Sequence, residues 1–259
     1  MAQVTPSLDP EDARIAFYCD FENIALGVRD AKYKTFDVRK VLNRLVEMGK
    51  IVVKKAYADW DAYGKYKRAF HSEGIELIEI PQRAYSGKNS ADIRMVVDAM
   101  DLCYAKDHIN CFAIASGDSD FSPLVSKLKE NDKYIIGVGV KNSTSDLLVE
   151  NCDEFIYYDD IVREGTASPL KKKLRGTGEK EREAFERVLD ALQALERQNR
   201  EVIWGSMVKQ AIKRKHPQFS EHYLGYRSFS HLLQEAQRKN LLALERDERS
   251  GGYIIRTAD

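Results

Sequence analysis

Short apolar runs alternate with amphipathic stretches along roughly the first 160 residues of the chain. The runs are rich in Ile, Val, Phe and Tyr and are bounded by polar, Gly or Pro positions, which is typical of β-strands. They lie at residues 15–19, 51–57, 75–80, 111–115, 134–140 and 155–158. Between them, apolar positions spaced three or four apart predict helices over residues 37–48, 63–73, 91–105, 124–128 and 147–149.

Strands that alternate with helices of about 10–15 residues are expected to pair in parallel through right-handed crossovers. We therefore predict an α/β fold, a three-layer parallel sheet with the strand order 3-2-1-4-5 in chain numbering. In this order the first and fourth strands, residues 15–19 and 111–115, flank the point where the strand order reverses. Open α/β sheets bind their ligands at the carboxyl ends of the strands at such a point.

Two of the predicted helices have a marked apolar face. In the helix over residues 37–48 the face consists of Val38, Val41, Leu42, Leu45 and Val46, and Gly49 ends the pattern. In the helix over residues 91–105 it consists of Ile93, Val96, Val97, Met100 and Tyr104. We expect both faces to pack against the sheet.

The alternation breaks at residues 163–180, where Gly, Ser, Pro and a run of lysines predict a basic linker. Three more helices are predicted beyond it, followed by a hairpin, at residues 181–198, 204–215, 228–239, 241–245 and 253–256. Three helices and a hairpin predict a winged helix. The expected organisation is a tail (1–13), an α/β domain (14–162), this linker and a winged-helix domain (181–259).

The composition is that of an ordinary globular protein. Of 259 residues, 43 % are hydrophobic and 32 % are charged, and the chain has neither a long apolar run nor a signal peptide at its start. We therefore expect no membrane span and a cytoplasmic location. The four cysteines form no C-x-x-C pair, which predicts free thiols and no structural zinc.

Charge is balanced overall but unevenly distributed. Residues 169–259 contain 19 Lys and Arg against 13 Asp and Glu, so that 22 and 28 of the 41 of each sign remain for the first 168 residues. The first part thus has a balance of −6 and the second part +6. An acidic part joined to a basic part fits a metal-dependent catalyst attached to a binder of polyanions.

Acidic and polar residues follow the two central strands. Asp20 ends the first run, with Glu22 and Asn23 just behind it, and Ser116-Gly117-Asp118-Ser119-Asp120 follows the fourth. Because carboxylates brought together at one sheet edge repel one another, they need a cation in order to remain charged. The sequence therefore predicts a divalent-metal site.

These motifs resemble the NYN domain, a branch of the PIN-like ribonucleases. The resemblance covers residues 14–162 and rests on D-x-E-N from Asp20, S-G-D-S-D-F from Ser116, and Ala91-Asp92-Ile93 at the start of a helix. Ser145-Asp146-Leu147-Leu148 and the segment 151–155 are similar to the closing part of the family.

The resemblance implies a metal-dependent endoribonuclease that uses Mg²⁺ or Mn²⁺ to hydrolyse phosphodiester bonds of single-stranded RNA. The implied catalytic residues and metal ligands are Asp20, Asp92, Asp118 and Asp120, with Asn23 and Ser116 as polar support. Hard oxygen ligands are those that Mg²⁺ prefers, and a bound ion can acidify water and offset phosphoryl charge. Glu22 is left outside this ligand set.

Each of these residues also has a purely structural interpretation. Asp120 or Ser122 fits a helix N-cap before Pro123, and Asp92 fits the start of the helix that follows Ser90. Lys141, Ser143 and Thr144 fit either a phosphate contact or a helix cap with an exposed lysine. Lys88 fits a backbone contact to nucleic acid or a solvated loop.

The last domain resembles the LOTUS (OST-HTH) winged helix over residues 182–256, through Gly225-Tyr226-Arg227-Ser228-Phe229 and the Leu232-Leu233 pair. The resemblance implies binding of RNA, in some members guanine-rich and structured, or docking of a protein partner. Arg227, His231 and Arg238 lie on the polar face of the predicted helix 228–239 and are the candidate RNA contacts. A plain solvated surface is the alternative.

Two other functions remain open at this level. A non-catalytic RNA-binding regulator would use the same acidic site without turnover. A phosphatase or nucleotide hydrolase would also place acids after parallel strands. The chain has neither a P-loop nor a G-x-G-x-x-G motif, so nucleotide-cofactor binding has no support in the sequence.

Overall fold

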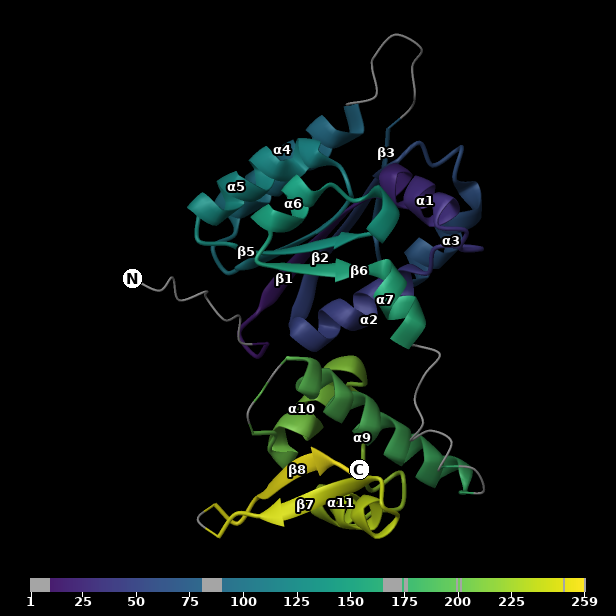
Figure 1. The fold of residues 1–259 in the computed structure, drawn as a ribbon, viewed down its shortest axis with the longest axis vertical. Helices are drawn as coiled ribbons and strands as arrows, with labels where there is room; N and C mark the ends of the chain where they lie inside the picture. Colours follow the sequence, from purple (N-terminus) through teal and green to yellow (C-terminus); the bar gives the residue numbers. More distant parts are fainter. Residues whose placement is uncertain are drawn as a thin grey trace. The chain divides into compact units, whose positions relative to one another are not determined.

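The computed structural model describes residues 10–80, 90–164, 174, 177–198, 200, 202–248 and 250–258 (Figure 1). The chain divides into two compact units, Met1–Gly165 and Thr166–Asp259. Each unit has its own hydrophobic core. Lys88 and most of the expected linker lie outside the described residues.

The first unit contains a six-stranded sheet in the order β3-β2-β1-β4-β5-β6, and all pairs are parallel. Its strands are β1 (Arg14–Asp20), β2 (Lys50–Ala58), β3 (Glu76–Glu79), β4 (Cys111–Ala115), β5 (Tyr134–Gly139) and β6 (Glu154–Tyr157). The predicted α/β fold and the order 3-2-1-4-5 are confirmed, and β6 extends the sheet beyond β5.

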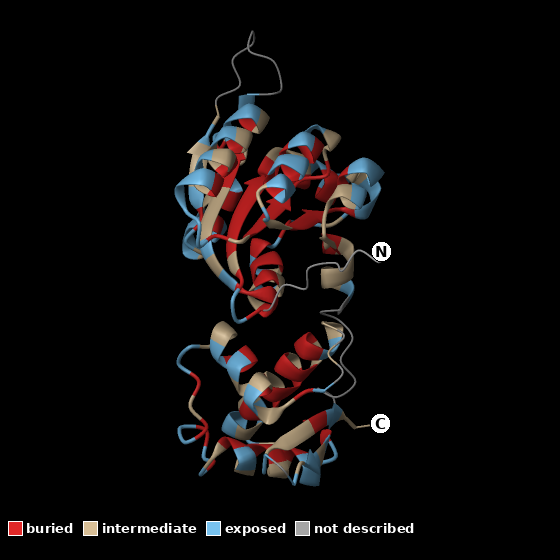
Figure 2. Ribbon diagram, turned by 90° about the vertical axis from the view of Figure 1, so that its left-hand side faces the viewer, coloured by how far each residue is buried: buried red, intermediate tan, exposed pale blue. Residues whose placement is uncertain are grey.

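Helices cover both faces of this sheet, which makes three layers (Figures 1 and 2). Ile15, Phe17 and Cys19 of β1 belong to one core with α1 (Phe21–Asp30), α2 (Val38–Met48) and α3 (Gly64–Ser72). Ala16 and Tyr18 belong to the other core with α4 (Ser90–Ala105), α5 (Ser122–Glu130) and α6 (Asp146–Asn151). β1 is therefore buried on both faces, as its unbroken apolar run requires.

Helices α1 and α7 (Tyr158–Glu164) were not predicted. Helix α1 begins at Phe21, directly after β1, with no turn residue between them. Asp20 is at once the last residue of the strand and the N-cap of the helix, where its side chain accepts a hydrogen bond from the Asn23 N–H. The sequence therefore contains no Gly, Pro or other turn residue that would mark where the strand ends and the helix begins.

The expected packing face of α4 was wrong. Ile93, Val97 and Tyr104 are 63 %, 56 % and 63 % exposed, whereas Val96 and Met100 are only partly buried. The buried face instead consists of Ala91, Met95, Ala99 and Cys103. Two of these residues are alanines, whose small side chains let the helix lie close to the sheet. The buried residues also recur every four positions, so helical periodicity alone does not distinguish this face from the predicted one.

A partly buried carboxylate, that of Asp98, links α4 to β2. The Asp98 carboxylate accepts hydrogen bonds from the Tyr57 hydroxyl at 2.8 Å and from Lys55 Nζ at 3.2 Å, and Arg94 Nε donates to it at 3.0 Å. The Tyr18 hydroxyl donates to the Asp98 carbonyl. The side chain of Asp98 is only 12 % exposed, so these partners replace the water that it has lost.

The second unit contains α9 (Glu179–Arg197), α10 (Gly205–Lys215), α11 (Phe229–Arg238) and an antiparallel hairpin of β7 (Leu242–Arg246) and β8 (Tyr253–Thr257). Leu192, Val208 and Leu232 contribute to its single core, one from each helix. The Gln234 amide donates to the Tyr253 hydroxyl at 2.7 Å and so links α11 to the hairpin. The three helices and the hairpin expected for this part of the chain are therefore present.

Among the described residues, no helix combines the length and the apolar composition needed to cross a membrane. All four cysteines are free thiols; Cys19, Cys103 and Cys111 are buried and Cys152 is partly buried.

The Asp98→Ala variant should lose about 2 kcal/mol of unfolding free energy, because the Tyr57 hydroxyl would be left without its acceptor in a partly buried place and Lys55 would keep only the longer contact with Glu76. Urea denaturation measures this loss. Asp101→Ala is the control, since Asp101 is exposed on the same helix. Equal stability of the two variants would contradict the anchoring role of Asp98.

Candidate active site

The site lies where β1 and β4 end. The strands are neighbours in parallel register, with Cys19 opposite Ala115, so that the next residue of each, Asp20 and Ser116, emerges at the same edge. Both side chains are buried, and Asp20 is only 6 % exposed. The Ser116 hydroxyl donates to Asp20 Oδ2 at 3.0 Å.

Ser116 and Asn23 hold the two chain segments together. The Ser116 Oγ also accepts from the Asp118 N–H at 3.2 Å, so that one hydroxyl contacts both acid-bearing segments. Asn23 Oδ1 accepts from the Gly117 N–H at 2.8 Å. The segments that carry Asp20 and Asp118 therefore form one site.

The capping roles differ from those that were expected. Asp118, rather than Asp120 or Ser122, is the N-cap of the short 3₁₀ helix η1 (Ser119–Phe121), and its Oδ1 accepts from the Asp120 N–H at 3.0 Å. Helix α5 has no side-chain cap, although Pro123 lies in its first turn. Asp120 is thus free of a capping role and is exposed.

The fourth aspartate belongs to a different element. Asp92 lies in the first turn of α4 and is partly buried. Burial raises the pKa of Asp92 to about 6, and the charges of Asp118, Asp120 and Glu22 add to this rise. Burial raises the pKa of Asp20 to about 7, with Asp92 as the next cause.

These mutual effects define one acid cluster, which consists of Asp20, Glu22, Asp92, Asp118 and Asp120. Glu22 was left out of the expected set. Its Oε1 accepts from the Asp59 N–H at 2.8 Å, which ties α1 to the loop after β2. The D-x-E-N motif contained the signal, but only the fold shows that Glu22 raises the pKa of both Asp20 and Asp92.

The donor chemistry of the acid cluster fits a hard divalent cation. Its carboxylates repel one another, which an ion would relieve, and carboxylate oxygen is the ligand type that Mg²⁺ and Mn²⁺ prefer. In the described part of the chain, however, no three His, Cys, Asp or Glu side chains are grouped as a ready metal-binding set. The charges of the cluster therefore act on one another, but its carboxylates are not yet gathered into a complete set of metal ligands.

The segment around Lys141 packs behind the Gly117 turn. A Cβ on Gly117 would lie 2.3 Å from the Ser143 carbonyl oxygen, so only glycine fits there, and the Ser145 N–H donates to the Gly117 carbonyl. The Thr144 hydroxyl donates to the Val140 carbonyl at 2.7 Å, as does that of Ser143 at 3.4 Å. Lys141 Nζ pairs with Asp160 at 2.9 Å. The contacts with the Gly117 turn are thus made by the backbone of Ser143 and Ser145, whereas these three side chains bond to Val140 and Asp160.

The remaining candidates belong to the second unit. Arg227 is exposed just before α11, and Arg238 is exposed at its end, where it pairs with Glu235 at 2.5 Å. His231 Nε2 lies 3.4 Å from the same Glu235 carboxylate, and the His231 N–H donates to the Ser228 hydroxyl that caps the helix. Glu235 thus offsets part of the positive charge of this face.

Comparisons with known proteins agree with this architecture. Residues 14–159 match the family model described as the NYN domain. The chain is 28 % identical over 176 residues to the uncharacterized protein MJ0482 of Methanocaldococcus jannaschii, which is 67 % of this chain and 68 % of that protein. It is also similar to the crystal structure of VPA0982, a protein of unknown function from Vibrio parahaemolyticus. That match has a TM-score of 0.52 and 25 % identity, and it covers 59 % of this chain and 96 % of the other.

Asp20→Asn should make the metal-free protein more stable at pH 8, by about 2 kcal/mol, because a buried charge is removed while hydrogen bonding is kept. The pKa of Asp20 is higher in the folded state than in the unfolded state, so proton binding by Asp20 stabilises the fold. This stabilisation is fully present below about pH 4 and is lost as the pH rises through about 7.

At pH 5 Asp20 is largely protonated, and the two proteins should differ much less. Thermal melting in EDTA at both pH values measures this, with the exposed Asp107→Asn as the control. The same stability difference at pH 5 and pH 8 would show that the charge of Asp20 is not the cause.

Proposed function

The chain belongs to the NYN domain family, and on that premise we propose that it is a divalent-metal-dependent endoribonuclease that hydrolyses single-stranded RNA. The observation that carries the proposal is the acid cluster: five carboxylates from β1, α1, α4 and the turn after β4 act on one another at the switch point of the sheet. Such a set is costly for stability, as the raised pKa values of Asp20 and Asp92 show, and a cation would offset that cost.

Asp20, Asp92, Asp118 and Asp120 are the proposed ligands of a Mg²⁺ or Mn²⁺ ion. When bound, the ion would acidify a water molecule and offset the charge that develops on the phosphoryl oxygens. Ser116 and Asn23 fix the positions of Asp20 and of the Gly117–Asp118 backbone through the hydrogen bonds described above. The exposure of Asp120 leaves it open to an incoming strand.

A non-catalytic RNA-binding regulator is the second candidate, because the described residues contain no closed metal-binding group. Cleavage of RNA oligomers with Mn²⁺, and its loss in EDTA, separates the two functions. Small phosphomonoesters offered in the same assay test the phosphatase alternative.

Asp118→Asn should lower metal-dependent RNA cleavage by about a hundredfold or more, since one ligand charge is lost. The fold should persist, because an asparagine oxygen can still accept from the Asp120 N–H. Initial rates with labelled single-stranded RNA measure the effect. The exposed Asp107→Asn is again the control, and wild-type cleavage by Asp118→Asn would exclude the acid cluster as the active site.

For the second unit, the proposed role is that of a LOTUS-type module that binds RNA through Arg227, His231 and Arg238, or else a protein partner. The exposed Arg227 makes no ion pair with any residue that the structure describes, so its charge remains available to a phosphate. Arg238 shares Glu235 with His231, which leaves this face only partly cationic. RNA is the ligand that we favour here, because residues 169–259 have a balance of +6.

The double variant Arg227→Ala/Arg238→Ala should bind single-stranded RNA more weakly, and its slope of log K against log salt should be smaller by about 1.4. Fluorescence anisotropy at several salt concentrations measures this. Lys50→Ala/Lys106→Ala removes the same charge from exposed positions of the first unit and is the control. An unchanged salt slope would show that Arg227 and Arg238 do not contact RNA phosphates.

A further inference from the structure

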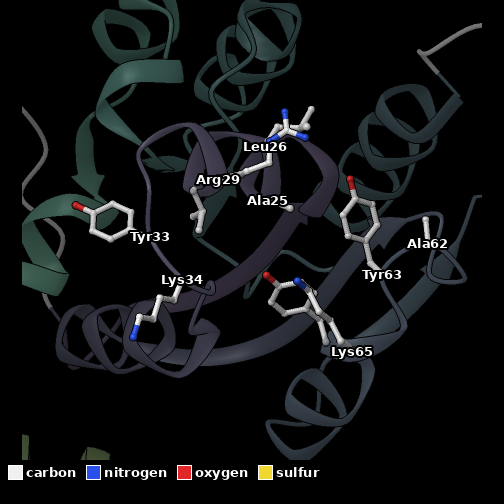
Figure 3. Close-up of a pocket in the computed structure, with 10 residues that line it drawn as sticks. Ala25, Leu26, Arg29, Tyr33, Lys34, Ala62, Tyr63 and Lys65 are labelled. Carbon is white, nitrogen blue, oxygen red and sulfur yellow. The ribbon is translucent and has the colours of Figure 1, made fainter.

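A pocket of about 230 Å³ lies between α1, the segment after it, and the turn that leads into α3 (Figure 3). Three tyrosines and three cations dominate its lining: Tyr33, Tyr63, Tyr66, Arg29, Lys34 and Lys65. The proposed reaction uses none of these six residues.

The tyrosine rings are held in place by packing. Tyr63 and Tyr66 both stand edge-on to the buried Phe21, with ring centroids 5.2 Å and 4.8 Å away. Tyr33 packs edge-on against Tyr158, and its hydroxyl donates to Asp159 at 3.1 Å. Rings that are already ordered lose little entropy when a flat ligand stacks on them.

The cations have little to neutralise them. Neither Lys34 nor Lys65 has a carboxylate within ion-pair distance among the described residues, and Lys65 Nζ lies 5.0 Å over the Tyr66 ring. Arg29 pairs with its chain neighbour Asp30, and both of these side chains are well exposed. A positive pocket is unexpected in a unit whose sequence is acidic, and it favours an anionic ligand.

Helix α1 connects this pocket to the acid cluster. Glu22 lies in its first turn, and Arg29 lies seven residues later on the same helix, or about 10 Å along its axis. Tyr63 lies in the electrostatic field of both residues: burial raises its pKa, Glu22 and Asp20 raise it further, and Arg29 lowers it. A strand that crosses the acid cluster therefore has a short path to the pocket.

We propose that this pocket binds a nucleotide of the RNA strand next to the scissile bond, with its base stacked on Tyr63 and its phosphate on Lys34 and Lys65. The inference rests on the proposed ribonuclease function for the identity of the strand. Aromatic rings that stack on bases and cations that follow the backbone are the usual means of binding single strands. At about 230 Å³ the pocket is smaller than sites that enclose a whole small molecule, which measure about 300–1,000 Å³, so it would take the base while the rest of the nucleotide stays outside.

The test uses the full chain carrying Asp118→Asn, so that labelled oligoadenylate is not cut during anisotropy measurements. In this background, Lys34→Ala/Lys65→Ala should reduce the slope of log K against log salt by about 1.4, as expected for two lost phosphate contacts. Tyr63→Leu should weaken binding by about tenfold through lost stacking. Tyr63→Phe, which keeps the ring, should bind more tightly than Tyr63→Leu.

Lys50→Ala/Lys106→Ala is the charge-matched control, because both lysines lie far from the pocket. Lys50 begins β2 at the amino edge of the sheet, and Lys106 follows the end of α4 remote from Asp92. A free nucleotide is a second source of the same chemistry, so adenosine 5′-monophosphate and inorganic phosphate are tested as competitors. The mononucleotide should compete at the lower concentration, since phosphate alone has no ring to stack.

The outcomes separate this inference from the proposed function. If the wild-type chain cleaves RNA but the pocket variants bind oligoadenylate like the control, the pocket is not a nucleotide site. If the variants lose binding as expected while the wild type never cleaves RNA, the pocket stands and the ribonuclease proposal fails. Equal competition by phosphate and the mononucleotide would overturn the stacking role of Tyr63.

Discussion

The hydrogen bonds of the Ser116 hydroxyl are the contacts on which the geometry of the site depends. Ser116 donates to Asp20 and accepts from the Asp118 backbone, and it can do so only because β1 and β4 pair in parallel and end at the same edge. The close approach at Gly117 then brings the segment around Ser143 against the same turn. A few short-range contacts thus assemble groups that are almost a hundred residues apart in the chain.

Structural and chemical roles coincide in this cluster. Capping a helix and binding a metal need not be competing roles of the same carboxylate. Asp20 and Asp118 do cap the elements that follow them, yet both remain in the field of the other acids. A carboxylate offers about four acceptor positions, so a cap bond leaves others available to a cation. Capping also restrains the side chain, which favours an ordered site.

The aromatic core beneath α1 gives the acid cluster and the neighbouring pocket a common support. Phe21 packs against Phe36, Trp60, Tyr63, Tyr66 and Phe70. These contacts fix the start of the helix that carries Glu22 and Asn23, and they also fix the tyrosines of the pocket wall. Burying so many rings around one residue makes α1 a rigid element, which is what precise positioning of charged groups requires.

The sequence by itself determined the strands, their parallel order and the meeting of Asp20 with Asp118, because strand periodicity and crossover handedness are local rules with few exceptions. Only the tertiary structure decided which face of α4 is buried, that α1 starts at Phe21, and that Glu22 acts on Asp20 and Asp92. The pocket around Tyr63 and Lys34 was likewise invisible, since its walls come from separate segments. The reason is physical: periodicity reports a residue's own element, whereas burial and electrostatic coupling depend on what other elements bring near it.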